Sequence, residues 1–164
     1  MQQPPLLPEE TLARVLRLAK LDGTSVLVLA AAFAIMAAAG GDSRFAVIGL
    51  LGAGAGAIEL HGAALLRQGE TRGIRWLIAS QPFLLGVIYA YCFLRLTHFE
   101  MPPIPERFRE TLDETARQLG MSVEDYFQMV NRLTAQLVGV IATIYQGWML
   151  VYYLRRRHTV VRAL

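Results

Sequence analysis

The chain has 164 residues with a net charge of +3, and 54% of the residues are hydrophobic while 18% are charged. Soluble domains average about 45–50% apolar and about 25% charged residues, so this composition favours a membrane protein of one domain, without a separate catalytic module. The basic residues lie beside apolar blocks and form no basic face of their own, which argues against nucleic acid as a partner. A lone cysteine, Cys92, excludes an internal disulfide and a cysteine zinc cluster.

Residues 9–21, the first patterned segment, predict an amphipathic helix. Its apolar residues recur on one side at helical spacing. Its cations lie on the other side: Arg14, Arg17 and Lys20. Such a helix can lie in the membrane surface with its apolar side toward the lipid, or it can be the polar beginning of a first span. We favour the surface helix, because Asp22-Gly23 offers a place to bend.

Four apolar blocks then predict four membrane spans, and hence an all-α integral membrane protein. The expected spans are residues 24–39, 45–66, 74–96 and 133–154. A helix needs about 20 apolar residues to cross a hydrocarbon layer of about 30 Å. The first span is short and rich in alanine, so we expect neighbouring helices to cover it. The last span is expected to belong to one unbroken helix from Val123 to Arg157, which at about 52 Å is too long for the bilayer alone.

The long hydrophilic stretch, residues 97–132, predicts an extramembrane helical hairpin between the third and fourth spans. Pro105 suits the first turn of a helix, and Gly120 suits its C-terminal end. Ser122 followed by Asp125 is typical of a second helix that begins with its own N-terminal cap. Each helix carries an apolar stripe, so we expect the two to pack against each other or against another subunit.

The distribution of basic residues predicts a multi-pass cell-membrane protein with both termini on the cytoplasmic side. Three cations lie in the N-terminal segment, three flank the connection between the second and third spans, and four arginines lie in the C-terminal tail. The first turn carries one arginine, and the long hydrophilic stretch carries four arginines against seven carboxylates. Cytoplasmic segments are enriched in lysine and arginine, so four crossings fit every segment.

Glu59, in the second span, is the principal candidate for a functional residue. An ionisable group inside a membrane span is costly unless it is paired or faces a wet cavity. Gly52 and Gly56 share its side of the helix and form a small-xxx-small pattern, which brings two helix backbones close together. Glu59 is therefore expected to face protein instead of lipid. It lies about 12 Å along the helix from Arg67, which marks the cytoplasmic edge.

Other polar residues lie at a similar depth and are candidate partners for Glu59. Gln81 and Gln146 lie near its level, each several residues inside a cytoplasmic arginine. His61 points about 200° away from Glu59, at about 100° per residue, so the two cannot act as a pair from one helix. We expect His61 to meet another helix or another subunit near the cytoplasmic surface.

One side of the fourth span carries small and polar residues: Gln136, Gly139, Thr143, Gln146 and Gly147. Such a stripe can line a water path. It can equally provide hydrogen bonds between helices, worth about 0.6 kcal/mol each on average. Both interpretations stay open. The aromatic residues near the C-terminus are most simply an interfacial belt: Trp148, Tyr152 and Tyr153.

These residues lead to two hypotheses for the function. No nucleophile–base pair and no metal-ligand cluster can be assembled from the sequence, so we expect no enzyme, no metal site and no other cofactor. The first hypothesis is a homo-oligomeric channel or carrier for a small ion, which uses Glu59 and the polar side of the fourth span. The second is a non-catalytic accessory or scaffold protein that docks a protein partner through its external hairpin. Both place the chain in the lipid bilayer.

Overall fold

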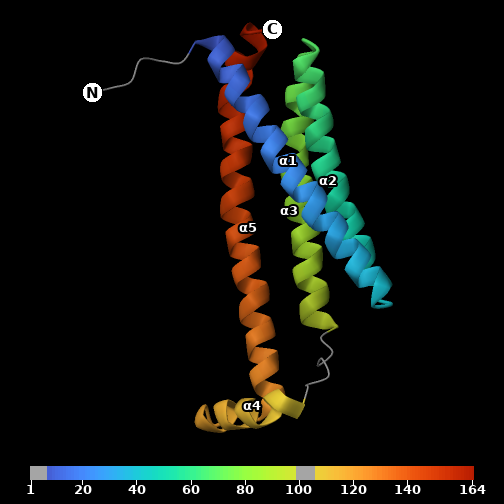
Figure 1. The fold of residues 1–164 in the computed structure, drawn as a ribbon. Helices are drawn as coiled ribbons and strands as arrows, with labels where there is room; N and C mark the ends of the chain where they lie inside the picture. The colour runs from blue at the N-terminus through green and yellow to red at the C-terminus, as the bar shows by residue number, and fades with distance from the viewer. Residues whose placement is uncertain (1–6, 99–105) are drawn as a thin grey trace, which may run out of the picture.

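The computed structural model describes residues 7–98 and 106–164, which are helical apart from short turns. They form five helices: α1 (Pro8–Ala39), α2 (Ser43–Arg67), α3 (Gly73–Thr97), α4 (Glu106–Gln118) and α5 (Val123–Arg162). Of these, α1, α2, α3 and α5 are long and apolar enough to cross a membrane. The predicted all-α fold with four such helices is therefore confirmed (Figure 1).

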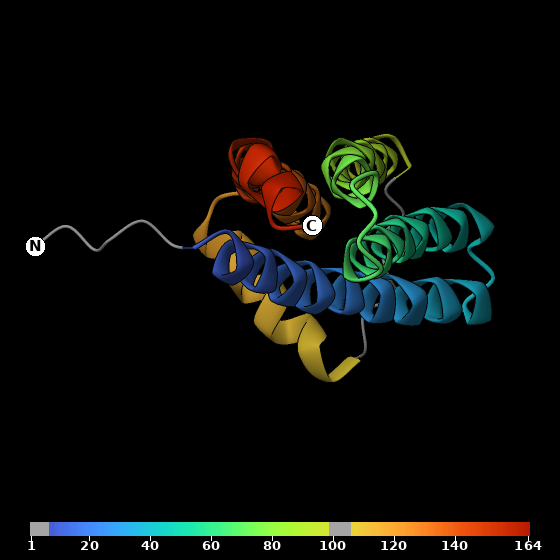
Figure 2. The same cartoon turned by 90° about the horizontal axis from the view of Figure 1, so that it is seen from above.

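The four long helices form a bundle in which α1 packs on α2, α2 packs on α3, and α5 packs on both α3 and α1. The start of α1, the α2–α3 turn and the end of α5 lie at one end of the bundle, which we call the terminal end (Figure 1). The α1–α2 turn, the end of α3 and the start of α5 lie toward the opposite, distal end. Helix α1 runs obliquely across the bundle, so it lies near α5 at the terminal end and diverges from it distally (Figure 1 and Figure 2).

The apolar core lies at the terminal end, where all four long helices contribute side chains. Its buried members are Val15, Ala19, Ala63, Leu66, Ile74, Leu77, Met149, Tyr153 and Val160. Lipid tails are as apolar as these side chains, so inside a membrane their contribution comes from close packing more than from escape from water. The core therefore joins the first and last helices of the chain at this end.

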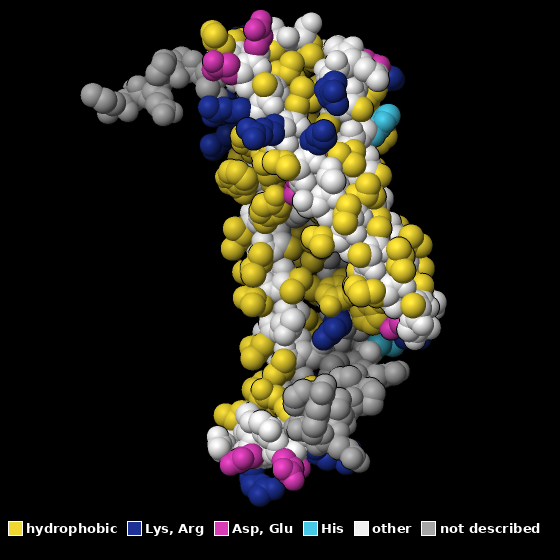
Figure 3. Space-filling model, viewed as in Figure 1, with side chains coloured by type: hydrophobic (Ala, Val, Ile, Leu, Met, Phe, Trp, Pro, Cys, Tyr) yellow, Lys and Arg dark blue, Asp and Glu magenta, His cyan; other side chains and the backbone are white. Residues whose placement is uncertain are grey.

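The first segment, residues 9–21, is not a separate surface helix. It forms the first turns of α1, which continues without a break through Asp22-Gly23. Its apolar side enters the core through Val15 and Ala19, because an apolar stripe fits a neighbouring helix as well as a lipid surface. Three cations of this segment stay exposed: Arg14, Arg17 and Lys20. Figure 3 shows lysine and arginine side chains gathered near the terminal end.

The rest of α1 is more exposed than its alanine content suggests. Among residues 24–39, only Ala34 is buried. Large apolar side chains point outward, including Val28, Leu29 and Ile35. The expectation that neighbouring helices cover this span is wrong. Its small residues allow close contact with α2, but this contact covers a single face of the helix. The other faces are apolar, as contact with lipid requires.

Helix α5 is unbroken over 40 residues, about 60 Å, so it is longer than a hydrocarbon layer of about 30 Å, as expected. Helix α4 lies across the distal end of α5 instead of running back along it (Figure 1). Ala116, in the last turn of α4, is buried, whereas most of α4 is exposed. The two helices do not pack along their lengths, because the turn at Gly120, with a φ of 69°, sets them at an angle. Pro105, the expected start of the first hairpin helix, lies outside the described residues.

Candidate functional site

Glu59 lies where three helices meet. Its side chain on α2 is 1% exposed, and its Oε1 atom accepts two hydrogen bonds from other helices. The Tyr153 hydroxyl of α5 donates at 2.7 Å, and the Gln81 amide nitrogen of α3 donates at 3.2 Å. The same nitrogen donates to the Ser80 hydroxyl at 3.2 Å. Gln81 therefore contacts Glu59, as its depth in the membrane suggested. On α5 the hydrogen-bond partner of Glu59 is Tyr153 and not Gln146, which was expected from depth.

Asp22 contributes a second carboxyl group, from α1. It is 9% exposed, and its Oδ1 atom accepts a hydrogen bond of 2.8 Å from the Tyr145 hydroxyl of α5. Its carboxyl group also interacts with that of Glu59. We call six side chains the polar cluster: Asp22, Glu59, Ser80, Gln81, Tyr145 and Tyr153. All four long helices contribute to this cluster, which adjoins the apolar core through Tyr153.

Close contact between α1 and α2 brings the two carboxyl groups together. Gly23 follows Asp22, and a Cβ atom at Gly23 would lie 3.1 Å from the Gly56 carbonyl oxygen and 3.3 Å from the Glu59 Cβ. A Cβ atom at Gly56 would lie only 2.6 Å from the Leu27 backbone nitrogen. A side chain at Gly56 would push the helices apart, so glycine at this position sets how closely the two carboxyl groups approach.

The same α1–α2 contact continues toward the distal end. A Cβ atom at Gly52 would lie 3.1 Å from the Ala30 Cβ, and one at Gly49 would lie 2.7 Å from the Ala34 Cβ. Gly52 and Gly56, the pair expected to form a close helix contact, therefore both lie against α1. The close contact extends to Gly49, three residues before Gly52 and outside the predicted pair.

The polar cluster contains buried oxygens that lack a hydrogen-bond partner among the described residues. Two oxygens of the cluster, Asp22 Oδ2 and Gln81 Oε1, have no partner within residues 7–98 and 106–164, and neither does the buried Gln146 Oε1 of α5. No cation pairs with Asp22 or Glu59, since the described residues contain a single ion pair, between Arg72 and Glu70 in the α2–α3 turn. Two adjacent carboxylates in an apolar interior are costly. The arrangement therefore suits a proton or a small cation shared by these oxygens.

The polar stripe predicted on the fourth span divides between two sides of α5. Gln146 is 4% exposed and lies on the inward side, two turns from Tyr153. Gln136 is exposed, and Thr143 is exposed and shares a hydrogen bond of 2.6 Å with the Tyr89 hydroxyl. The inward side instead follows buried residues at seven-residue spacing: Gly139, Gln146, Tyr153 and Val160. Which of these residues point inward depends on how α5 is rotated against α3 and α1. The spacing of residues within α5 alone does not determine that rotation.

His61 lies apart from the polar cluster. Its side chain is exposed and packs edge-on against the Trp76 ring of α3, with 5.6 Å between ring centroids. It therefore meets a neighbouring helix at the surface of the bundle, on a different side of α2 from Glu59.

Four members of the polar cluster do not follow from the sequence: Asp22, Ser80, Tyr145 and Tyr153. From sequence, Asp22 indicates a bend and Tyr153 indicates an interfacial belt. An ionisable residue that directly precedes an apolar block also carries a cost, although a smaller one than a residue in the middle of a span, and this signal could have identified Asp22. Nothing in the local pattern distinguishes Tyr153, which is buried, from Tyr152 beside it.

Among residues 7–98 and 106–164, no group of three or more histidine, cysteine, aspartate or glutamate side chains is placed to hold a metal ion. No protein-family model matches the chain, and comparisons with curated proteins and with solved structures found no match. The chemistry of the polar cluster is therefore the basis on which a function is assigned.

Proposed function

We propose that the protein is a membrane carrier or channel for a small cation, with the proton as the first candidate. The supporting observation is the carboxyl pair of Asp22 and Glu59, which lies buried beside unpaired oxygens and has no basic partner among the described residues. A proton, or a small cation such as Na⁺, supplies both the positive charge and the contacts that these oxygens lack. Ionisable groups inside a membrane domain commonly belong to ion and proton pathways.

The exposure of the polar cluster suggests where a cation enters. The Tyr145 side chain is 42% exposed, so the hydrogen-bonded pair of Asp22 and Tyr145 lies at the edge between α1 and α5. Glu59, Gln81 and Tyr153 are almost completely buried. In this proposal Asp22 receives the cation first and Glu59 holds it at the inner position, where hydrogen bonds from α3 and α5 orient the carboxyl group.

The proposal includes self-association of the chain. Gln136 lies on the outside of α5 among exposed apolar residues, which include Leu137, Val140 and Ile141. The Thr143 hydroxyl, in contrast, is already hydrogen-bonded within the bundle. A polar side chain that faces lipid is costly, whereas a second copy of the chain can supply hydrogen-bond partners between helices. A homo-oligomer in the lipid bilayer would cover Gln136.

The proposed orientation in the cell membrane places the terminal end in the cytoplasm and α4 outside, because the arginine-rich segments lie at the terminal end. In intact cells, an impermeant maleimide is expected to label Glu110→Cys, in a background with Cys92→Ala. Arg157→Cys, the matched control, is expected to react only after the membrane is permeabilised. Labelling of position 110 from the inside alone would contradict the four-span orientation.

Reconstitution into liposomes tests the transport itself. Under a pH gradient, the wild type is expected to carry protons faster than empty liposomes do, or to carry Na⁺ or K⁺ under a gradient of that ion. The double variant Asp22→Asn and Glu59→Gln is the matched protein control and is expected to give the background rate. A wild type at the background rate for all three ions, at acidic, neutral and alkaline pH, would contradict the proposal.

A second candidate function is an accessory protein that docks a protein partner through α4. The observation in its favour is the place of α4, which lies across the far end of α5, away from the polar cluster (Figure 1). Most of its side chains within residues 109–118 are exposed and free to meet a partner. Under this function the wild type carries no ion, and deletion of residues 106–118 leaves the thermal stability of the bundle unchanged.

A further inference from the structure

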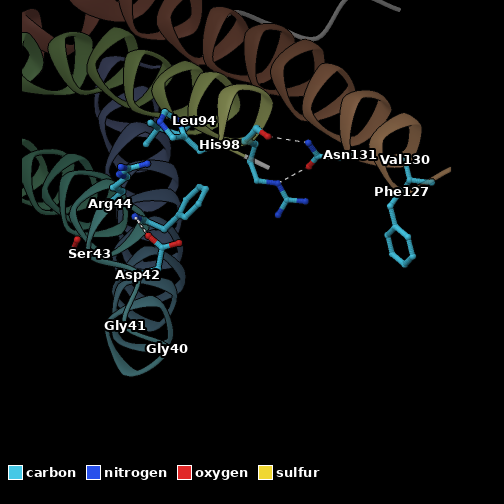
Figure 4. A pocket seen from close by; sticks show the side chains of 12 residues that line it. Gly40, Gly41, Asp42, Ser43, Arg44, Leu94, His98, Phe127, Val130 and Asn131 are labelled. Atoms are coloured by element: carbon cyan, nitrogen blue, oxygen red, sulfur yellow. Dashed lines mark hydrogen bonds between the residues drawn. The ribbon is translucent and has the colours of Figure 1, made fainter. Parts of the chain in front are cut away.

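A pocket of about 720 Å³ lies at the distal end of the bundle. It is formed by the α1–α2 turn, the start of α2, the end of α3 and the distal part of α5 (Figure 4). The start of α2 lies 16 residues before Glu59, about 24 Å along the helix, so this pocket is separate from the polar cluster. Nothing in the proposed transport uses it.

Arg95 is held in this pocket by a side chain from another helix. Asn131 of α5 is 5% exposed, and its Oδ1 atom accepts a hydrogen bond of 2.8 Å from the Arg95 Nε. The Asn131 amide nitrogen donates to the Arg95 carbonyl oxygen at 2.9 Å, and the dashed lines in Figure 4 mark both bonds. The two terminal amino groups of the guanidinium take part in neither bond, and within the described part of the chain no residue pairs with them. A guanidinium oriented in this way can bind a phosphate or carboxylate group through two parallel hydrogen bonds.

The charges that line the pocket favour an anion. The residues that line it include two arginines, Arg44 and Arg95, and one carboxylate, that of Asp42. Asp42 is already engaged, because its Oδ1 atom caps α2 by accepting a hydrogen bond of 3.2 Å from the Phe45 backbone nitrogen. The residues that line the pocket therefore carry one positive charge in excess.

The remaining walls of the pocket are apolar: Phe45, Leu94, Phe127 and Val130. In the four-span arrangement, the end of α3 and the start of α2 lie at the outer boundary of the hydrocarbon layer, where lipid headgroups lie. We infer that the pocket binds the phosphate of an anionic lipid headgroup, with Arg95 and Arg44 on the phosphate and the lipid chain against the apolar walls. A phosphate accepts charge-assisted hydrogen bonds from arginine side chains, which two arginines at one pocket can supply.

Native mass spectrometry of the full-length protein in mild detergent tests this inference. Phosphatidylglycerol, phosphatidylcholine with the same acyl chains, and inorganic phosphate are added separately. The wild type is expected to retain phosphatidylglycerol in preference to phosphatidylcholine. Arg95→Gln is expected to weaken that retention about tenfold, because it removes charge-assisted hydrogen bonds to the phosphate. Arg44→Gln is expected to weaken it as well, and because this side chain is exposed, its replacement is not expected to disturb the fold.

Arg75→Gln is the matched control, since it removes one positive charge from an exposed position near the terminal end. It is expected to leave lipid retention unchanged. Binding of inorganic phosphate that depends on Arg95, without retention of phosphatidylglycerol, would support the phosphate site and assign it to a soluble anion. Equal retention of the two lipids, or an equal loss in the Arg75 and Arg95 variants, would overturn the inference.

Discussion

Replacement of Glu59 by glutamine is expected to reduce cation flux in liposomes to the background rate, while the fold and the assembly stay intact. Glutamine keeps the size of the side chain and retains an oxygen that can accept the hydrogen bonds from Tyr153 and Gln81. It loses only the ability to ionise and hence to bind a proton or a cation. Flux and thermal unfolding are measured on the same preparation. Glu70→Gln removes a carboxylate from the α2–α3 turn, outside the polar cluster, and is expected to carry ions at the wild-type rate.

Replacement of the same residue by leucine separates a transport role from a structural one. Glu59→Leu leaves the buried Tyr153 hydroxyl without its acceptor and removes one of the two hydrogen bonds of the Gln81 amide nitrogen, which keeps its bond to Ser80. An unsatisfied buried donor of this kind costs about 1–3 kcal/mol of stability. A clear fall in the unfolding temperature is therefore expected for leucine and not for glutamine. If the glutamine variant instead carries ions at the wild-type rate, Glu59 is a structural hydrogen-bonding group. That result would favour the accessory function.

Gly56→Ala is expected to have the second large effect, although it adds a single methyl group. The new Cβ atom would lie 2.6 Å from the Leu27 nitrogen and 2.7 Å from the Gly23 carbonyl oxygen, and both are backbone atoms that cannot rotate away. Helix α1 must shift, at a cost of about 1–3 kcal/mol for overpacking. The same shift moves Asp22 away from Glu59, so ion flux is expected to fall together with the unfolding temperature.

Gly54→Ala is the matched control for this substitution. Gly54 lies two residues away on the same helix, and a Cβ atom there would meet no atom within 4 Å. Alanine is favoured over glycine in a helix by up to about 1 kcal/mol, so stability is expected to stay unchanged or to rise slightly. Equal unfolding temperatures for the two alanine variants would show that close contact between α1 and α2 does not set the geometry of the polar cluster.

The number of long apolar helices and their approximate bounds follow from the sequence alone. The expected second span, residues 45–66, corresponds to α2 at Ser43–Arg67, and the third, residues 74–96, corresponds to α3 at Gly73–Thr97. Long apolar runs between polar turns have one simple interpretation, because a hydrocarbon layer demands about 20 residues per helix. The burial of Glu59 also agrees with expectation, since its cost in lipid and the glycines on its side of α2 both point toward a protein neighbour.

The tertiary structure alone decides which residues accompany Glu59. Tyr153 lies 94 residues away in the sequence, and the pair of Asp22 and Tyr145 is separated by 123 residues. These contacts depend on how α1 and α5 are tilted and rotated against α2. A helical repeat of apolar residues does not specify that rotation, because lipid and a neighbouring helix satisfy the same apolar face equally well. For this reason residues 9–21 fit a membrane surface by pattern but pack in the bundle, and Gln136 points outward while Gln146 points inward.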